Sequence, residues 1–551
     1  MMSLKYLNAH TSRLKIQQTV VVLSASVFAL VLIAFFMPLA VAVAPVFYGG
    51  NPAPVLKTLF KAARFTLLQA FLSAAGASCI GLCAAFFCAR REFFGRTALL
   101  SLSAIPLSVP PVVIALAFIL FFGKNGALNR VLLSVSAGRI STGTFLYSTG
   151  GVLLVHSFYN FPITMRTVSA VWEQLPEETE QAACLLGAPP LRIFKTIIFP
   201  ALKAPFFASF VIIFLYCFFS FVIILLLGGL GVTTLEVELY QTIRTNVHAS
   251  AAAWIAVLET GIAGAVVALY AYLRSRSFDH VENTQYIRLR SRLGGVKERL
   301  IFTALICCIC FCLLLPLGSL LLYSLSTPDS ALSEPYSTFG FVRSLSFRSW
   351  RQLLQRPSFW SAVRQTVQIG IETSFFSVAA ALFFAYLSFF LKRSWYKSLP
   401  LFPFAVSPII LGSGWLKLDI LPSAFMLIIV QSSLAWPFAW MQIETVLAKI
   451  PCSTVDAARL LSASRSDAFF RTFLPLCKTG IVPAFCCVFA ISAGDASLPI
   501  LLHIPEFENL ALMLFRFAGA YRFTESSSIA VILAALTGLL FFIQDSVRNR
   551  I

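Results

Sequence analysis

Polar side chains stand inside long apolar stretches of this chain, where each of them needs a partner. Within a bilayer such groups are costly and usually face a cavity or another helix, so they are candidates for the path of a solute. A hydrogen bond to a neighbouring helix, without any contact to a solute, is the alternative for each residue. The candidates are His156, Asn160, Ser220, Glu259, Glu372, Gln431, Trp436 and Asp495.

Aromatic faces and prolines accompany these groups. Tyr159, Trp436 and Trp440 could stack on a flat cationic ring. Pro162 and Pro437 lie inside predicted spans, where a proline leaves a backbone carbonyl without its helical partner.

Two polar segments between apolar stretches organise the rest of the chain. They cover residues 176–200 and 451–475, and an offset of 275 superposes Pro176 on Pro451 and Pro200 on Pro475. The same offset makes Ser220 the counterpart of Asp495. A match at one register in two places indicates two copies of one unit. We therefore expect two homologous halves, residues 1–285 and 286–551.

Each segment has the pattern of a short helix, a turn and a second helix. Small residues on the first helix would let another surface approach its backbone closely. In the first copy Gly187 can adopt the left-handed conformation that ends a helix. Ser462 stands in its place in the second copy, so the two turns should differ.

The composition places these segments in an integral membrane protein. Of the 551 residues 58% are hydrophobic and only 12% are charged, too little polar surface for a soluble globule. Apolar runs of about 20 residues can cross a bilayer as helices, and we expect an all-α polytopic fold with about 12 of them. The predicted spans are 19–47, 65–89, 98–122, 146–171, 204–228, 250–273, 299–325, 364–391, 397–415, 420–446, 479–502 and 527–544.

Basic residues set the expected orientation. They gather beside the spans on the side that would carry both termini and both repeated segments, which the positive-inside rule places in the cytoplasm. The span at 98–122 contains Pro106, Pro110 and Pro111, which should break or kink it.

Charge, cysteines and missing motifs exclude other classes of protein. The net charge of +19 lies beside the spans and not on a separate basic domain, which favours membrane lipids over nucleic acid as partners. The 13 cysteines match no zinc pattern, and most fall in spans, so neither a metal site nor disulfides are expected. The chain contains no G-x-x-x-x-G-K-[ST] loop and no G-x-S-x-G elbow. We expect a transport subunit that is no enzyme and binds no cofactor of its own.

The repeated segment resembles the EAA loop of the permease subunits of binding-protein-dependent ABC importers. The motif residues are Gln181, Ala182, Ala183 and Gly187, with Glu180 beside them, and in the second copy Asp456, Ala457, Ala458 and Ser462. The fused two-copy layout is similar to the thiamine and iron(III) permeases. Leu-Gly-Gly at 227–229 and Thr-Thr-Leu-Glu at 233–236 carry part of that similarity.

This resemblance implies a type I importer permease in a bacterial inner membrane. It implies a periplasmic or lipid-anchored binding protein, and separate ATPase subunits, two copies for two loops, that bind ATP and Mg. The motif residues would form the helices that seat on those ATPases. The implied solute is thiamine or its phosphates, with iron(III) as the alternative.

An ion-coupled secondary transporter is the alternative from another class. Internal repeats and buried carboxylates suit such a carrier equally well. The paired EAA-like segments favour the ATP-driven importer, because a secondary carrier does not require them.

Overall fold

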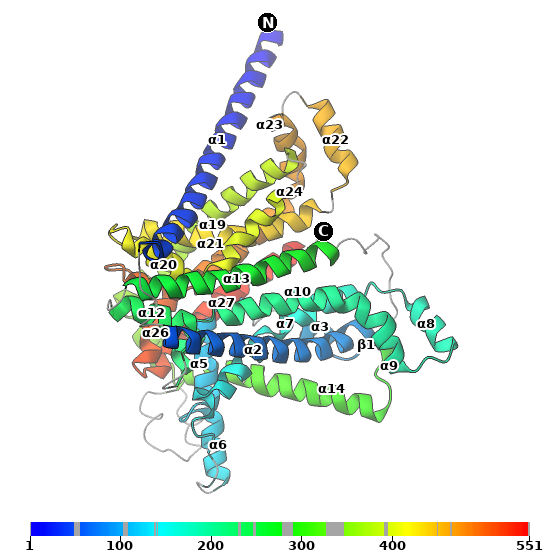
Figure 1. The fold of residues 1–551 in the computed structure, drawn as a ribbon, viewed down its shortest axis with the longest axis vertical. Helices are drawn as coiled ribbons and strands as arrows, with labels where there is room; N and C mark the ends of the chain where they lie inside the picture. The colour runs from blue at the N-terminus through cyan, green and yellow to red at the C-terminus, as the bar shows by residue number, and fades with distance from the viewer. Residues whose placement is uncertain are drawn as a thin grey trace. The chain divides into compact units, whose positions relative to one another are not determined.

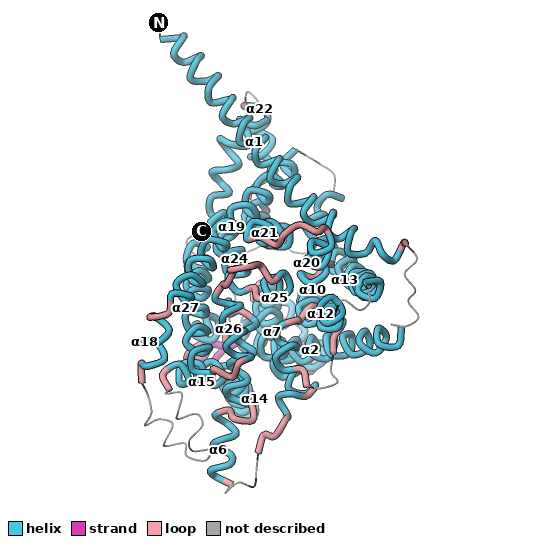
Figure 2. Tube along the Cα trace, turned by 90° about the vertical axis from the view of Figure 1, so that its left-hand side faces the viewer, coloured by secondary structure: helices cyan, strands magenta, loops and turns pink. Residues whose placement is uncertain are grey.

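The computed structural model describes residues 2–48, 56–102, 108–136, 139, 141–229, 233–245, 249–277, 290–326, 346–390, 395–448, 450–462 and 465–548. Helices dominate the described chain, as Figure 2 shows. The chain divides into two compact units. The first-repeat unit comprises Asn51–Pro357 and Met513–Ala534, and the second-repeat unit comprises Met1–Gly50, Ser358–Leu512 and Ala535–Ile551. The expected boundary of the repeats at 285 and 286 lies outside the described residues.

The first-repeat unit is built around α2 and α7, which pack along each other. Its elements are α2 (Leu56–Arg90), β1 (Arg91–Glu92), α3 (Arg96–Leu102), α5 (Pro111–Phe122), α6 (Ala127–Val135), α7 (Thr149–Trp172), α8 (Glu177–Leu185), α9 (Pro190–Ile193), α10 (Phe199–Phe218), α11 (Val222–Leu227), α12 (Leu235–Thr245), α13 (Ala249–Ser277), β2 (Ser291–Arg292), α14 (Val296–Ile309), α15 (Leu315–Ser324) and α18 (Arg348–Leu354). Strands β1 and β2 pair in parallel, Arg91 with Ser291 and Glu92 with Arg292. The close approach of α2 to α7 follows from small residues on the buried face of α2, including Ala70, Ala74, Ala77, Ala84 and Ala85.

The second-repeat unit has its core where α21 packs on α24 and α1. Its elements are α1 (Met2–Val43), α19 (Pro357–Phe390), a 3₁₀ segment (Trp395–Ala405), α20 (Pro408–Lys417), α21 (Ala424–Leu447), α22 (Cys452–Leu461), α23 (Arg465–Ala468), α24 (Leu474–Gly494) and α25 (Ser497–Leu502). Helices α26 (Leu510–Gly519) and α27 (Phe523–Arg548) belong in part to each unit. Large apolar side chains such as Phe28, Phe384 and Trp436 fill the core of the second-repeat unit.

The helix that opens each half packs in the unit built mainly from the other half. In the second-repeat unit α1 contacts α20 and α21, and in the first-repeat unit α15 contacts α5. The contact of α1 is close, since a Cβ atom on Gly414 would lie 1.9 Å from the carbonyl oxygen of Pro38. Trp415 Nε1 donates to the carbonyl oxygen of Ala34 at 3.2 Å. The compact units therefore differ from the sequence repeats by an exchange of their first helices and by the assignment of Met513–Ala534 to the first-repeat unit.

The expected membrane fold is confirmed. Ten helices of the described residues are long and apolar enough to span a membrane, and Leu399–Ala405 with Pro408–Lys417, bent by 84°, would add one more. Helix α7 has 24 residues, and its polar groups make it less apolar than these. Together these helices correspond to the twelve predicted spans. The predicted break near residue 106 fits the end of α3 at Leu102 and the start of α5 at Pro111, although Pro106 itself lies outside the described residues.

Three π-helical segments occur where a proline interrupts a helix. They are Phe194–Ile198, Cys310–Leu314 and Phe469–Phe473, and Pro200, Pro316 or Pro475 follows two residues later. Because proline has no N–H to donate to the carbonyl four residues earlier, the preceding turn widens. The first and third segments are 275 residues apart, so both repeats reproduce this distortion near the end of the repeated polar segment.

Candidate functional site

The first repeated segment is held to its unit by an ion pair. Glu180 of α8 is 8% exposed, and its carboxylate accepts hydrogen bonds from both Nη atoms of Arg90, the last residue of α2, with Nη1 to Oε1 at 2.7 Å. This bidentate contact fixes the orientation of the two side chains as well as the distance between them. Burial raises the pKa of the Glu180 carboxyl, and the charge of Arg90 opposes that shift. Figure 1 shows α8 beyond the end of α2 that leads into β1.

The turn after α8 has the predicted left-handed glycine. Gly187 has φ +76°, and the N–H of Ala188 donates to the carbonyl of Ala183 at 3.0 Å. The N–H of Gly187 donates to the carbonyl of Cys184 at 2.9 Å. These two bonds form the Schellman arrangement that satisfies carbonyls at the end of a helix. The chain then enters α9 through Pro189 and Pro190.

The second repeated segment has the same helix with different anchors. Helix α22 ends at Leu461, and Ser462 takes an extended conformation with φ −93° and ψ 144°. Val455 stands at the position of Glu180, so α22 has no carboxylate there. Asp467, which is 4% exposed, pairs instead with Arg471 at 2.6 Å, inside the turns that follow. The two turns therefore differ in conformation.

The predicted motif residues form a partly exposed surface on each helix. Gln181 and Ala182 are exposed on α8, as are Asp456 and Ala457 on α22. Ala183 and Ser462 are partly exposed, and Ala458 is buried at 7% exposure. No partner chain is present, so the contact of these residues with an ATPase stays a prediction.

Sequence reasoning missed a pair of leucines at the end of each helix. Leu185 and Leu186 are 89% and 87% exposed, and their counterparts Leu460 and Leu461 are 85% and 88% exposed. Adjacent apolar side chains that repeat at one offset on an otherwise polar helix end are typical of an interaction surface. The signal was the shared Leu-Leu pair at the offset of 275.

A histidine joins three elements in the core of the first-repeat unit. His156 of α7 is 1% exposed, with Nδ1 2.6 Å from Gln69 Nε2 of α2 and Nε2 2.9 Å from Ser220 Oγ after α10. A neutral imidazole that accepts at Nδ1 and donates from Nε2 would satisfy both contacts. Asn160 donates to the carbonyl of His156 at 3.0 Å, and Ser73 lies 3.4 Å from Nδ1. The structure thus brings three predicted residues together.

The second-repeat unit has an amide and a carboxylate in the equivalent positions. Gln431 Nε2 of α21 donates to Asp495 Oδ2 at 3.0 Å, and the backbone N–H of Ser497 donates to Oδ1 at 2.9 Å. Ser492 and Thr373 donate to Gln431 Oε1 at 2.6 Å and 3.3 Å. Gln431 is 5% exposed, whereas Asp495 is partly exposed within its unit. The carboxylate is therefore oriented by fixed donors from α21 and from the start of α25.

These two clusters occupy equivalent places in the two repeats. Gln431 follows His156 by 275 residues, as Asp495 follows Ser220. A shared hydrogen bond supports the same alignment: Thr66 Oγ1 accepts from the N–H of Leu235, and Thr366 Oγ1 accepts from the N–H of Leu510, both at 2.9 Å. Sequence reasoning matched Ser220 with Asp495 but missed the match of His156 with Gln431.

Three predicted residues lie outside both clusters. Glu259 of α13 is fully buried and contacts Glu236 of α12, a neighbour that sequence reasoning missed. Glu372 is partly exposed on α19 and accepts from Gln368 Nε2 at 3.0 Å. Trp436 is 1% exposed and packs edge-on against Phe28 at 5.5 Å between ring centroids. A solute contact for each of these residues stays a prediction.

The clusters have the chemistry of binding sites. They combine the hydroxyl, imidazole and amide groups of the first cluster with the amide and carboxylate of the second. Among the described residues no three His, Cys, Asp or Glu side chains gather as metal ligands. The arrangement can hold and orient a polar or cationic solute.

Comparisons with known proteins agree on a transport role. Relatives that match nearly the whole chain are thiamine transport system permease proteins ThiP. The protein of Brucella suis biovar 1 (strain 1330) is 25% identical over 512 residues, which is 88% of this chain and 87% of the relative. That of Escherichia coli (strain K12) is 25% identical over 512 residues, or 89% and 90%. A putative 2-aminoethylphosphonate transport system permease protein PhnU of Salmonella typhi is 30% identical over 252 residues, 44% of this chain and 87% of the relative.

The family description "Binding-protein-dependent transport system inner membrane component" matches residues 77–279 and 373–551, more than half of the chain. The two matched segments fall one in each half, as expected of a fused permease with two copies of one unit. A multi-pass inner membrane protein of this kind works with ATPase subunits and a substrate-binding protein. The chain belongs to the family of binding-protein-dependent transport system inner membrane components, the permease subunits of ABC importers.

Proposed function

We propose that this permease imports thiamine or its phosphates. The observation that carries the proposal is that relatives matching nearly the whole chain are thiamine permeases, whereas the phosphonate permease matches 44% of it. Both halves of the chain are thus shared with proteins whose named solute carries a flat cationic ring.

The chemistry of the polar clusters supports a cation. The Asp495 carboxylate is held by Gln431 Nε2 and the N–H of Ser497, and it is partly exposed within its unit. A His156 imidazole that donates from Nε2 and accepts at Nδ1 would be held as a neutral hydrogen-bonding group. A carboxylate that is oriented by neutral donors favours a solute with a cationic part.

The repeated helices supply the contact for ATP-driven movement. Helices α8 and α22 present the motif residues and the exposed pairs Leu185–Leu186 and Leu460–Leu461 toward two ATPase subunits in the cytoplasm. Nucleotide binding draws the ATPases together, and the two helices transmit that motion to the spans that follow them. The binding protein delivers solute from the opposite side, and both termini lie in the cytoplasm.

The test is uptake into proteoliposomes that contain this chain, its ATPase and its binding protein. Labelled thiamine, ferric iron and 2-aminoethylphosphonate are supplied separately outside, with ATP inside. We expect thiamine to accumulate only with ATP and the binding protein. An ATPase that binds but does not hydrolyse ATP serves as the control.

Each other outcome contradicts a defined part of the proposal. Accumulation of ferric iron or of 2-aminoethylphosphonate in place of thiamine would reject the solute and keep the importer. Accumulation driven by an ion gradient, without the ATPase, would reject ATP coupling and support the secondary transporter.

A further inference from the structure

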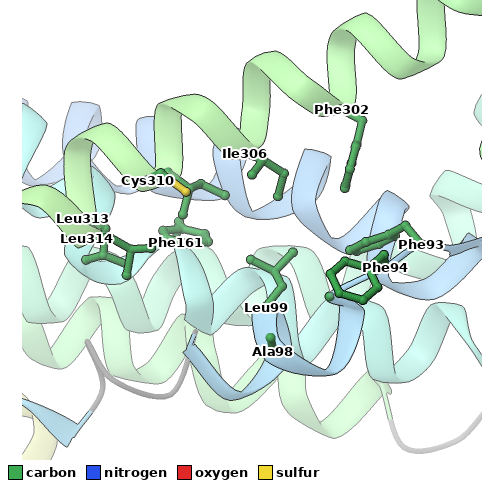
Figure 3. Close-up of a pocket in the computed structure, with 12 residues that line it drawn as sticks. Phe93, Phe94, Ala98, Leu99, Phe161, Phe302, Ile306, Cys310, Leu313 and Leu314 are labelled. Atoms are coloured by element: carbon green, nitrogen blue, oxygen red, sulfur yellow. The ribbon is translucent and has the colours of Figure 1, made fainter.

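An apolar cavity of about 210 Å3 lies in the first-repeat unit, on one side of α14. Figure 3 shows Phe302, Ile306, Cys310 and Leu314 pointing into it from α14 and the π-helical segment after it. Their spacing of four residues places them on one face of the helix. From 302 to 314 this stripe extends about 18 Å, at 1.5 Å per residue. The cavity is therefore elongated along the helix.

The opposite wall of the cavity is apolar as well. Phe93, Phe94 and Leu99 line it from the segment around α3, and Phe161 lines it from α7 (Figure 3). Leu99 and Phe161 also belong to a buried core cluster, whereas Phe94 is fully exposed at the mouth of the cavity. A polar solute would lose its hydration here without gaining a partner. The shape and the lining fit a hydrocarbon chain.

Several cationic residues lie close in the chain to Phe93 and Phe302, at one end of the cavity. Arg91 precedes Phe93, Arg299 precedes Phe302 by one helical turn, and the pairing of β1 with β2 brings Arg292 beside Glu92. Arg292, Lys297 and Arg299 are exposed. The cavity thus joins an apolar slot to a basic rim.

The acidic groups at this rim are too few to neutralise it. Glu298 pairs with Arg91, and Glu173 pairs with Arg96 at 2.7 Å and with Arg290 at 3.5 Å. Among the described residues named here, Glu92 is the remaining carboxylate and lies 4.0 Å from Arg290. These three carboxylates face six cations, namely Arg91, Arg96, Arg290, Arg292, Lys297 and Arg299. The rim keeps a positive excess that suits a phosphate.

We propose that this cavity is a binding site for an anionic phospholipid of the leaflet on the side of α8, with an acyl chain along α14 and the phosphate at Arg292 and Arg299. Anionic lipids are attracted to basic segments beside spans. The occupant would link α14 to α3 and α7, and so stabilise the end of the unit that carries α8.

The experiment measures lipid binding to the purified full-length chain. Dioleoyl phosphatidylglycerol or dioleoyl phosphatidylcholine is titrated against the chain in detergent, and bound lipid is counted by native mass spectrometry. We expect wild type to prefer the anionic lipid. The variant Arg292→Gln with Arg299→Gln should lose about 25-fold in affinity for phosphatidylglycerol, near fivefold per charge, and none for phosphatidylcholine. Lys203→Gln, an exposed cation on α10, is the matched control and should bind as wild type does.

A second variant tests the apolar slot. Ile306→Trp fills the cavity and should abolish the binding of one lipid molecule. Leu321→Trp on α15, where Leu321 is 54% exposed and does not line the cavity, should leave that binding intact. Equal binding of the two lipids by wild type would overturn the proposal, as would binding that survives both Ile306→Trp and the loss of the two arginines. Because Arg292 and Arg299 are exposed, the variant that replaces both should fold. That variant still tests the proposal if Ile306→Trp fails to fold.

Discussion

The two polar clusters share one framework and differ in charge. In the first repeat His156 on α7 is hydrogen-bonded to Ser220, which follows α10, at 2.9 Å. In the second repeat Gln431 on α21 is hydrogen-bonded to Asp495, which follows α24, at 3.0 Å. The first pair is neutral and buried, whereas the second ends in a partly exposed carboxylate. Duplication thus preserved the geometry of the site while the two copies took different chemical parts.

The two repeated helices differ in a similar way. Helix α8 is tied to α2 through Glu180 and Arg90, and its turn depends on Gly187. Helix α22 has Val455 and Ser462 in those positions. Both helices still expose an adjacent pair of leucines at the same offset. The shared part of the segment is therefore the outward surface, and the variable part is its attachment.

The largest loss of uptake is expected from changes to the leucine pairs that α8 and α22 share. Leu185→Glu with Leu186→Glu, or Leu460→Glu with Leu461→Glu, places charges on the proposed ATPase contact. Central apolar anchors contribute 2 kcal/mol or more each to an interface, and their effects are not additive, so we expect ATP-driven uptake to fall about 100-fold or more. Uptake rates and co-purification of the ATPase measure this.

Leu191→Glu is the control for these variants. Leu191 is 65% exposed on α9, close to the same turn but outside the repeated pair. This variant should retain its ATPase and its uptake. Wild-type uptake by both double variants would exclude the leucine pairs from the contact, and loss in only one of them would show that the two helices couple unequally.

The general architecture could be predicted from the sequence because membrane spans and repeats leave strong local signals. Apolar length predicted the twelve spans, and the repeat at one offset predicted α8 and α22. The exchange of α1 and α15 between units could not be predicted, because it depends on contacts such as that of Gly414 with Pro38, far apart in the chain. A partner for Glu259 was missed for the same reason: Glu236 approaches it only when α12 packs on α13.

The next largest loss of uptake is expected at Asp495, the charged residue by which the second cluster differs from the first. Asp495→Asn keeps the shape of the side chain and removes its charge, whereas Ser220→Ala removes a neutral group at the equivalent position. Interactions of charged groups are worth about 1.5–3 kcal/mol and neutral hydrogen bonds about 0.5–1.5 kcal/mol. We expect thiamine uptake at low concentration to fall about 10- to 100-fold for Asp495→Asn and about 2- to 10-fold for Ser220→Ala.

The concentration dependence of uptake sharpens this comparison. If Asp495 binds the cationic part of the solute, Asp495→Asn should raise the concentration needed for half-maximal uptake. Gln365→Ala on α19, which removes a bond to the N–H of Glu508 outside the cluster, is the control and should change uptake little. Equal effects of Asp495→Asn and Ser220→Ala would reject a special role for the carboxylate.

The smallest loss of uptake is expected from breaking the ion pair that attaches α8 to α2. Arg90→Gln leaves the Glu180 carboxylate buried without its cation, and breaking such a pair costs about 3–5 kcal/mol. We expect faster hydrogen exchange in α8 and unchanged exchange in α22, which has Val455 at the equivalent position. Uptake should fall only severalfold, because the leucine pair that contacts the ATPase remains.

The pH dependence of this exchange identifies the cause. Burial holds the pKa of the Glu180 carboxyl above its usual value, so the docking of α8 is strongest at low pH and weakens as the pH rises through that pKa. In Arg90→Gln the opposing cation is absent, the pKa rises further, and the loss of protection at neutral pH should be larger and reversed by acid. Adding Glu180→Gln to Arg90→Gln removes the titrating group, so protection of α8, corrected for intrinsic exchange, should no longer depend on pH. If protection of α8 still depends on pH in that double variant, a group other than Glu180 causes the dependence. The Glu180–Arg90 pair would then not explain how the attachment of α8 differs from that of α22.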